Sequence, residues 1–300
     1  MAALLLSGDG LLFICNITAG AGTAQAGWQR VHDCMQQAGF TFEYRMTEYA
    51  GHAVELAKEA VERGERDIVA VGGDGTLNEV LQGVWGNPCR IGIIPAGTGN
   101  DYARSLQIPT DPEQAAQVIM NGKCAPYDVG LANGMPFLNN AGLGIDVSIV
   151  ELTARISRKL HIGKLSYILA TIWMLLTYRF PEVRIWVDDV LAYEGRLMLC
   201  SMGNGQYIGG GMCALPLAKA DDGLFDVCIV SRIPRWKCLF LFAKFIKGKH
   251  LDLSCVKYLN GKHVRIESQY IPSFEMDGNV ISSIPQEFTI QPSAMEIFVP

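Results

Sequence analysis

One stretch decides the fold prediction, and it reads Val69-Ala70-Val71-Gly72-Gly73-Asp74-Gly75-Thr76-Leu77-Asn78-Glu79. An apolar run of strand type leads directly into glycines, and a helical pattern begins near Thr76. Glycines let the backbone turn sharply and approach a ligand closely, and the first turn of a helix offers free N–H groups to an anion. We therefore predict a phosphate-binding loop. In it, Asp74 orients a metal-bound phosphate or a substrate hydroxyl, and Thr76 caps the helix or binds phosphate. The structural alternative is a tight turn before a capped helix.

A second loop of the same kind reads Pro95-Ala96-Gly97-Thr98-Gly99-Asn100-Asp101. It also follows an apolar strand, residues 90–94, and precedes a helix. Loops after neighbouring parallel strands meet at the carboxyl edge of a sheet, where open α/β sheets bind ligands. Neither loop fits G-x-x-x-x-G-K-[ST] or G-x-G-x-x-G, so those two nucleotide fingerprints are not supported.

The first third of the chain alternates short apolar strands with amphipathic helices. Glycines end the first two helices. The predicted strands are residues 11–15, 40–46, 67–71 and 90–94, and the predicted helices are residues 24–38, 51–63 and 77–84. Repeated β-loop-α units of this length indicate an α/β fold with a mostly parallel sheet and helices on both faces.

After about residue 125, short strand-like runs separated by turns predict an antiparallel sandwich or barrel. These runs are residues 136–138, 183–187, 193–200, 224–230, 264–266 and 287–290. A helical insert at 150–178 and a helix near 234–246 interrupt them. We divide the chain into a nucleotide-binding α/β domain, 1–130, and a β-rich substrate domain, 131–300, whose last residues return to the first domain.

Composition excludes several classes of protein. Hydrophobic residues make up 49% and charged residues 18%, which disfavours disorder. A net charge of −5 does not favour nucleic acid as a partner. Nine cysteines without a C-x-x-C pair indicate reduced intracellular thiols, so we expect a cytoplasmic protein.

Two apolar stretches bear on membrane contact. We interpret the apolar N-terminus, which lacks a basic region, as a leader before a buried strand, with a signal peptide as the alternative. The longest apolar run, 167–178, has twelve residues, while a membrane span needs about 20. The chain is therefore expected to be soluble or peripheral to the membrane.

With both loops in view, the sequence resembles the diacylglycerol kinase catalytic-domain family, which includes bacterial lipid kinases, sphingosine kinases and ceramide kinases. The matching segments are GGDGTLNEV at 72–80 and IIPAGTGNDYARSL at 93–106. GGDGT alone also occurs in NAD kinases and phosphofructokinases, so the second segment is the more discriminating. The likeness continues in 137–144, 209–211 and 216–226, and it covers nearly the whole chain.

The resemblance implies that ATP and Mg²⁺ are the cofactors. ATP contacts would come from Thr47, Gly72, Gly73, Asp74, Gly75, Thr76, Leu77, Asn78, Gly97, Thr98, Asn100 and Asp101. Asp74, Asp101 and Asp128 would organise magnesium and its waters. A second, structural magnesium would be held by the Asp222 carboxylate and by the backbone carbonyls of Lys219 and Leu224, because hard cations prefer oxygen ligands. The alternative for residues 221–223 is a plain hairpin turn.

Two departures from the family pattern stand out. The segment after the first strand, residues 16–20, lacks the usual proline. Near the C-terminus the family usually carries Asp-Gly-Glu, whose glutamate is the proposed general base, whereas this chain has Asp277-Gly278-Asn279. An amide cannot accept that proton, although Asn279 can orient the hydroxyl. Asp277, Glu275 or Asp74 is then expected to act as the base.

Two segments combine apolar residues with nearby basic ones, as suits an anionic membrane surface. The first is the apolar helix 166–178, which follows Arg155, Arg158, Lys159, His161 and Lys164. The second is 232–250, with Arg235, Lys237, Lys244, Lys247, Lys249 and several aromatic residues. The alternative for each is an ordinary core-facing helix with solvated lysines.

The sequence therefore predicts an ATP- and Mg²⁺-dependent kinase of a diacylglycerol-like or other membrane lipid, active in phospholipid biosynthesis and in peripheral contact with the membrane. One alternative is a weak or inactive lipid- or nucleotide-binding homologue, based on Asn279. Another is a kinase for a soluble substrate such as NAD, based on GGDGT alone. The identity of the lipid and the oligomeric state stay open, with a homodimer among the alternatives.

Overall fold

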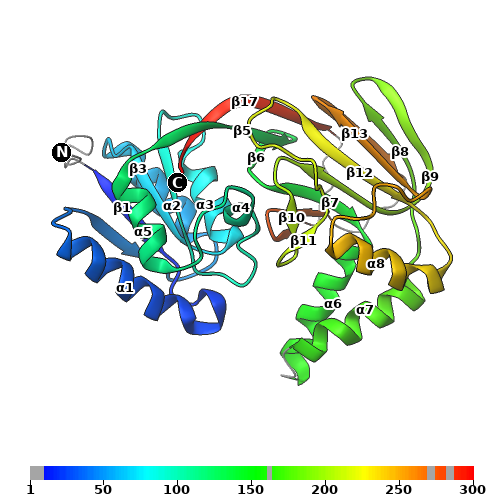
Figure 1. Cartoon of the computed structure of the whole chain (residues 1–300), viewed down its shortest axis with the longest axis horizontal. Helices are drawn as coiled ribbons and strands as arrows, with labels where there is room; N and C mark the ends of the chain where they lie inside the picture. Colours follow the sequence, from blue (N-terminus) through cyan, green and yellow to red (C-terminus); the bar gives the residue numbers. More distant parts are fainter. Residues whose placement is uncertain (1–9, 161–163, 269–273, 282–286) are drawn as a thin grey trace.

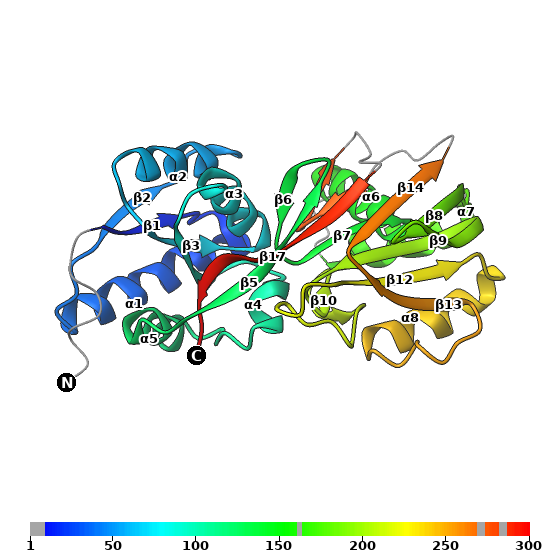
Figure 2. The same cartoon turned by 90° about the horizontal axis from the view of Figure 1, so that it is seen from above.

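The computed structural model describes residues 10–160, 164–268, 274–281 and 287–300, which form two lobes joined by long strands (Figures 1 and 2). The first lobe contains a parallel sheet in the order β2-β1-β3-β4. Its strands are β1 (Leu11–Cys15), β2 (Glu43–Met46), β3 (Asp67–Gly72) and β4 (Arg90–Pro95). All five residues of β1 are buried, as expected for a central parallel strand covered on both faces.

Helices cover both faces of this parallel sheet. Figure 2 shows α2 and α3 on one face and α1 and α5 on the other. The lobe contains η1 (Ala19–Gly22), α1 (Thr23–Gln37), α2 (His52–Glu62), α3 (Asp74–Val84), α4 (Asp101–Ser105) and α5 (Pro112–Asn121). The inward face of α2 is Ala53, Leu56, Ala57 and Ala60, the spacing that predicted this helix.

The second lobe is an antiparallel β-rich unit with helices below it in Figure 1. Its strands are β6 (Met135–Phe137), β7 (Asn140–Gly144), β8 (Glu182–Val187), β9 (Val190–Gly203), β10 (Tyr207–Ile208), β11 (Met212–Cys213), β12 (Phe225–Ser231), β13 (Val256–Gly261), β14 (His263–Ser268), β15 (Phe274–Met276) and β16 (Asn279–Ile281). Its helices are α6 (Ile145–Leu160), α7 (Lys164–Thr177), η2 (Arg235–Lys237) and α8 (Cys238–Ile246). The predicted fold class, a parallel α/β unit followed by an antiparallel β unit, is confirmed.

Two strands run through both lobes. β5 (Cys124–Ala132) pairs antiparallel with β17 (Glu287–Phe298) along most of its length. The start of β17 also pairs with β14, and its end pairs in parallel with β4 through Glu296 and Ile297. The C-terminal residues therefore lie against the first sheet. Our division at residue 130 stays a proposal, because it falls within β5.

The fold differs from the expectation at several elements. β5 was not predicted, because its sequence CAPYDVGLA carries a proline, an aspartate and a glycine, which are rare in strands. The insert expected over 150–178 is two helices and begins at Ile145. Within the described residues, no helix is both long and apolar enough to cross a bilayer.

Candidate active site

The first predicted loop lies at the carboxyl end of β3, where α3 begins. The helix begins at Asp74, two residues earlier than expected, and the extended residue Gly73 precedes it without a side-chain cap. The first helical hydrogen bond runs from Leu77 N to Gly73 O at 3.1 Å. The N–H groups of residues 74–76 therefore have no acceptor within the helix, and they can bind an anion.

The second loop touches the first. Ala96 N donates to Gly72 O at 2.8 Å. A Cβ atom placed on Gly97 would lie 2.4 Å from the Gly73 Cα, so only glycine allows this approach. Asn100, with φ of 52°, accepts a hydrogen bond from Gly97 N at 2.9 Å and donates one to Gly97 O at 3.0 Å. Asn100 thus shapes the loop through its side chain.

Replacement of Gly97 by alanine should separate the two loops, because the clash is with backbone that cannot move cheaply. We expect ATP affinity to fall about tenfold or more, a loss of about 1.4 kcal/mol or more in binding free energy, while the melting temperature changes little. Gly27→Ala in helix α1 is the matched control, since its Cβ would lie at an ordinary contact distance, 3.4 Å, from Pro112 Cγ of α5. Titration with a fluorescent ATP analogue measures both. Equal affinities for the two variants would contradict the loop contact.

Two carboxylates converge beside these loops. A Cβ placed on Gly99 would lie 2.9 Å from Asp74 Oδ2 and 3.2 Å from Asp101 Oδ2. Asp74 Oδ1 accepts from Tyr102 N at 3.2 Å, and Asp101 Oδ2 accepts from Gly210 N at 2.8 Å. Burial, with a smaller contribution from the charge of Asp74, raises the pKa of Asp101. Two converging carboxylates fit a divalent cation, which would stabilise both charges.

A cleft of about 320 Å³ joins these carboxylates to residues of the second lobe. Its first-lobe wall is made of Gly73, Asp74, Gly75, Thr98, Gly99 and Asp101; the second-lobe wall is Asn139, Val147, Ile208, Gly209, Gly210, Met212, Glu275 and Gly278. The glycine loops therefore face three apolar side chains of the second lobe, Val147, Ile208 and Met212, across a space large enough for part of a ligand.

Asp277 corrects one of our predictions. Its side chain is 3% exposed, and its two oxygens accept four hydrogen bonds. The donors are Leu138 N at 2.8 Å, Asn139 N at 2.9 Å, Asn140 N at 3.0 Å and Asn78 Nδ2 at 3.0 Å. Because Asn78 belongs to α3, this carboxylate ties the second lobe to the first lobe. We therefore assign Asp277 to positioning the lobes, not to accepting a substrate proton.

Other predicted ATP ligands have buried side chains. Asn78 is fully buried in the Asp277 cluster, and Leu77 packs in the core. Thr76 is 5% exposed and accepts from Asn16 Nδ2 at 3.1 Å. Because these side chains are buried, the predicted ATP contacts of the three residues stay predictions that depend on their backbone, of which Leu77 N already donates to Gly73 O. Thr76 is also not the helix cap.

Thr47 and Thr98 lie where a nucleotide can reach them. Thr98 is exposed and lines the cleft. Thr47 follows β2 at the same carboxyl edge of the sheet, where its N–H donates to Cys15 O at 2.9 Å. Both stay predictions for nucleotide contact.

The predicted second metal loop, Lys219 to Leu224, lies against Asp128. Asp128 is buried, and it accepts from Gly223 N at 2.6 Å and from Ser293 N at 2.8 Å. Asp222 is exposed and accepts from Leu224 N at 3.1 Å. The hairpin alternative is wrong, because β12, which follows the loop, pairs with β9 and β13 instead of the preceding strand.

The chemistry of this loop fits a hydrated magnesium ion. An exposed carboxylate and nearby backbone carbonyls are the oxygen ligands that Mg²⁺ takes, together with several waters. Burial, with a smaller contribution from the charge of Asp222, raises the pKa of the neighbouring Asp226. A cation here would relieve that repulsion. Within the described ranges, no three His, Cys, Asp or Glu side chains cluster as metal ligands, so most ligands would be carbonyls and water.

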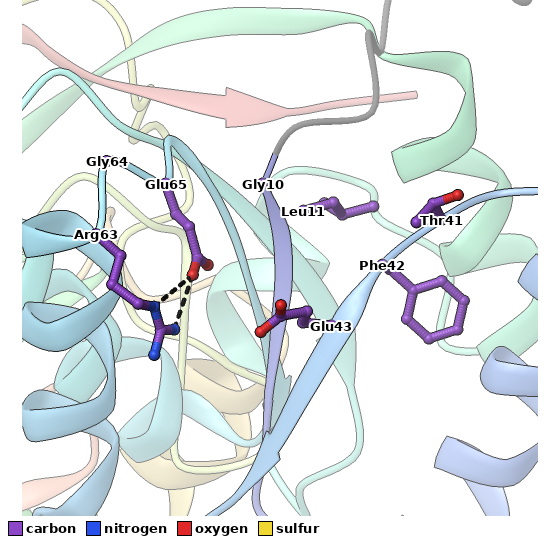
Figure 3. A pocket seen from close by; sticks show the side chains of 8 residues that line it. All are labelled: Gly10, Leu11, Thr41, Phe42, Glu43, Arg63, Gly64 and Glu65. Carbon is purple, nitrogen blue, oxygen red and sulfur yellow. Dashed lines mark hydrogen bonds and ion pairs between the residues drawn. The ribbon is translucent and has the colours of Figure 1, made fainter.

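A second cavity, of about 360 Å³, lies at the amino end of the first sheet (Figure 3). It is lined by Gly10, Leu11, Thr41, Phe42, Glu43, Arg63, Gly64 and Glu65. Figure 3 shows that Arg63 and Glu65 bind each other, with Nη2 2.7 Å from Oε1. Ligands of open α/β sheets bind at the opposite edge, so this cavity is not our candidate site.

Sequence reasoning missed contacts that join the two lobes near the cleft. Arg104 lies with Nη1 3.4 Å from Asp101 Oδ1, and its guanidinium lies over the Tyr207 ring at 5.5 Å. Ser105 Oγ accepts from Gln206 N at 3.0 Å. Arg104 and Asp101 are neighbours within α4. The pairs Arg104–Tyr207 and Ser105–Gln206 lie about a hundred residues apart in the chain, so no local pattern predicts them.

This geometry is that of a two-lobe protein in which a glycine-lined sheet edge faces a cleft between the lobes. A model of the diacylglycerol kinase catalytic domain matches residues 10–132, and a model of the YegS C-terminal NAD kinase beta sandwich-like domain matches residues 139–299. The chain therefore belongs to the diacylglycerol kinase family, which confirms the resemblance seen in its two loops. The names of the family and its relatives indicate a kinase.

Individual relatives match along nearly their whole length. The diacylglycerol kinase of Bacillus subtilis (strain 168) is 33% identical over 280 residues, 92% of this chain and 91% of the relative. That of Mycobacterium tuberculosis (strain ATCC 25618 / H37Rv) is 33% identical over 257 residues, 84% of this chain and 82% of the relative. The crystal structure of a candidate diacylglycerol kinase from Bacillus anthracis str. Sterne superimposes with a TM-score of 0.80 at 28% identity, covering 97% of both chains.

Proposed function

We propose that the protein transfers the γ-phosphoryl group of ATP to the hydroxyl of a diacylglycerol-like or related membrane lipid, in phospholipid biosynthesis. One observation carries the proposal: the cleft that joins Asp74 and Asp101 to the apolar wall of Val147, Ile208 and Met212. Phosphoryl transfer depends mainly on positioning and on charge stabilisation. The cleft supplies phosphate-binding N–H groups on one side and an apolar surface for an acyl chain on the other.

Each side of the cleft has a distinct role in this proposal. The backbone of Gly72 to Thr76 and of Gly97 and Thr98 binds the ATP phosphates, and Thr47 contacts the nucleotide. Asp74 and Asp101 hold Mg²⁺, which would neutralise phosphate charge when bound. Asn279 orients the lipid hydroxyl. Asp222, with the carbonyls of Lys219 and Leu224 and with Asp128 behind them, holds a structural Mg²⁺.

The direct test is transfer of labelled phosphate from ATP to lipid by the purified full chain with MgCl₂. The lipid panel contains diacylglycerol, monoacylglycerol, sphingosine and ceramide in mixed micelles, and NAD serves as the soluble acceptor. We expect a labelled lipid phosphate that requires both ATP and Mg²⁺. Labelling of NAD without any lipid product would reject the proposal in favour of a soluble substrate.

A second candidate function is a lipid- or nucleotide-binding homologue with weak or no catalysis. Asn279 favours it, because an amide stands where the family usually has a carboxylate. In that case the chain would bind ATP with ordinary affinity but transfer no phosphate to any lipid. Measurement of ATP binding and lipid phosphorylation on one preparation distinguishes the two functions.

We also propose that the protein acts from the cytoplasm and contacts the membrane through α7 and the η2–α8 segment. The inner face of α8 is buried through Cys238, Leu241 and Phe245, as the core-facing alternative expects. Trp236 of η2 is 66% exposed, and Phe240 of α8 is 71% exposed. A core-facing helix does not require these exposed aromatic side chains, and large exposed apolar patches mark interaction surfaces.

α7 also exposes large apolar side chains, and basic side chains lie in the η2–α8 segment. Trp173 is 60% exposed and Ile172 49%. The end of α7 contacts η2, where Arg235 Nη2 donates to Tyr178 O at 3.5 Å. The exposed basic residues of the η2–α8 segment are Arg235, Lys237, Lys244, Lys247 and Lys249. Of the first predicted basic stretch, His161 lies outside the described residues, as do the side chains of Arg155, Arg158, Lys159 and Lys164.

The double substitution Trp236→Ala/Phe240→Ala should weaken binding to phosphatidylglycerol-containing vesicles at least tenfold, since burial of each aromatic side chain contributes about 1.5–3 kcal/mol. Val190→Ala/Leu191→Ala is the control, because these residues are also exposed, at 69% and 47%, on the β8–β9 hairpin. Vesicle sedimentation measures both. Equal binding by the two variants would rule out this contact surface.

A further inference from the structure

The cleft contains a third carboxylate, and it belongs to the opposite lobe from the other two. Asp74 and Asp101 lie at the starts of α3 and α4, whereas Glu275 lies on β15. All three line the same cavity. We infer that Glu275 is the general base of the reaction, accepting the proton of the lipid hydroxyl. This inference rests on the proposed kinase function and adds a catalytic residue to it.

A tight turn holds Glu275 over the phosphate loop. Glu275 Oε1 accepts a hydrogen bond from Gly278 N at 2.6 Å. Gly278 has φ of 82°, a conformation that glycine adopts without strain. A Cβ placed on Gly278 would lie 4.0 Å from the Asp74 Cβ, so the turn lies directly against the start of α3. The Glu275 carboxylate is therefore fixed at the turn that meets the phosphate-binding helix.

The neighbouring polar residues of the turn cannot accept the proton. Asp277 is buried, and its carboxylate already accepts four N–H groups. Asn279 lies beside the loop, with its Oδ1 3.4 Å from the position that a Cβ on Gly75 would take. Its neutral amide is not a base at ordinary pH. It is placed to orient a hydroxyl or a phosphate oxygen, while the base function requires another group.

The two first-lobe carboxylates are better suited to a cation. Their Oδ2 atoms converge over Gly99, and Asp101 also accepts a backbone N–H from Gly210. A metal-bound carboxylate is a weak proton acceptor, because its lone pair is shared with the ion. Among the lining residues that the structure describes, there is no histidine or lysine. Glu275 is the remaining carboxylate, and it lies on the same lobe as the apolar wall, where the lipid would bind.

The proposed step is balanced with ATP as the only co-reactant. The lipid hydroxyl oxygen forms a bond to the γ-phosphorus, and the bond from that phosphorus to the β,γ-bridging oxygen breaks. The hydroxyl proton moves to the Glu275 carboxylate and then to water after the products leave. ADP carries away the electron pair of the broken bond. A positioned base of this kind contributes about 10²–10⁴-fold to the rate.

Glu275→Gln tests the assignment, because it keeps the size of the side chain and removes the base. We expect kcat for lipid phosphorylation to fall at least about 100-fold, with Mg-ATP affinity and melting temperature unchanged. The fall in kcat at low pH, which protonation of the base would cause, should also disappear. Glu194→Gln, which alters the exposed ion pair with Arg184 on β8 and β9, is the matched control and should behave as wild type.

A second pair of variants separates the inference from its rivals. Asn279→Glu in the Glu275→Gln background should restore most of the lost rate, because it returns a carboxylate to the turn beside the phosphate loop. The assignment would be overturned if Glu275→Gln kept the kcat and the pH profile of the wild type. A large gain in kcat from Asn279→Glu alone would overturn it as well. Lack of lipid phosphorylation by the wild-type chain would instead reject the proposed function, and with it this step.

Discussion

Asp277→Ala should destabilise the protein by about 3–5 kcal/mol, the range for removing one partner of a buried charged cluster. The substitution leaves four N–H groups without an acceptor in a site closed to water. Because one of them, from Asn78, belongs to α3, the link between the lobes is lost as well. Urea denaturation followed by tryptophan fluorescence measures the change in the free energy of unfolding.

Asp188→Ala is a matched control for this experiment. Asp188 has φ of 48°, close to the 47° of Asp277, so both variants place alanine in a left-handed conformation. Asp188 is exposed, and it accepts from Lys262 N and His263 N. Its loss should cost about 1 kcal/mol. If the two variants lose the same stability, backbone strain explains the result and the buried cluster does not link the lobes.

The Asp277 cluster also predicts a pH dependence. Burial raises the pKa of Asp277 to about 6, against the opposing effect of its N–H donors, while an unfolded aspartate has a pKa of about 3.9. The native state therefore holds the proton more tightly than the unfolded state. The contribution of protonated Asp277 to the free energy of unfolding is full below about pH 4 and is lost as the pH rises through about 6. Relative to Asp277→Asn, the wild type should lose stability across this range.

Asp74→Asn should reduce kcat about 10³-fold, which corresponds to about 4 kcal/mol of transition-state stabilisation. The amide oxygen can still accept from Tyr102 N, so the start of α4 keeps its position. The lost negative charge should weaken the Mg²⁺ site that we propose for Asp74 and Asp101. Lipid phosphorylation at saturating ATP measures kcat, and a titration with MgCl₂ should show a higher requirement for the ion.

Asp111→Asn provides the comparison for Asp74→Asn. Asp111 also stands at a helix N-terminus, where its Oδ1 accepts from Gln114 N at 3.1 Å in α5. Asparagine caps a helix as well as aspartate does, and the residue lies away from the cleft. This variant should keep its activity. An Asp74→Asn enzyme with wild-type kcat and magnesium requirement would remove Asp74 from the metal site.

Hydrogen bonds between the two lobes lie close to the residues of these predictions. Asp101 reaches Gly210, Asn78 reaches Asp277, and Ser105 reaches Gln206. Each contact pairs the carboxyl edge of the first sheet with the second lobe. The distance between the phosphate loops and the apolar wall is therefore set by hydrogen bonds next to the reacting groups. Substitutions at these contacts should change catalysis and stability together.

The sequence alone determined the two loops and the fold class. Apolar strands that run into glycines are local signals, and each loop needs only its own residues to adopt its shape. The contact of Gly73 with Gly97 followed from the expectation that their strands are neighbours. The same local reasoning placed α1, α2 and α3 within a few residues, because amphipathic spacing and terminal glycines are local features of the sequence; α5 was not predicted.

Only the tertiary structure decided which carboxylate is buried and which lines the cleft. Asp277 and Glu275 are two residues apart, yet one is buried among four N–H donors and the other lines the cleft. That difference comes from residues 138–140 and from α3, far away in the chain. The buried side chains of Thr76 and Asn78 have the same origin. Burial and hydrogen-bond partners depend on long-range packing, so the residue types suggested candidates for the site, and the packing of the two lobes assigned their roles.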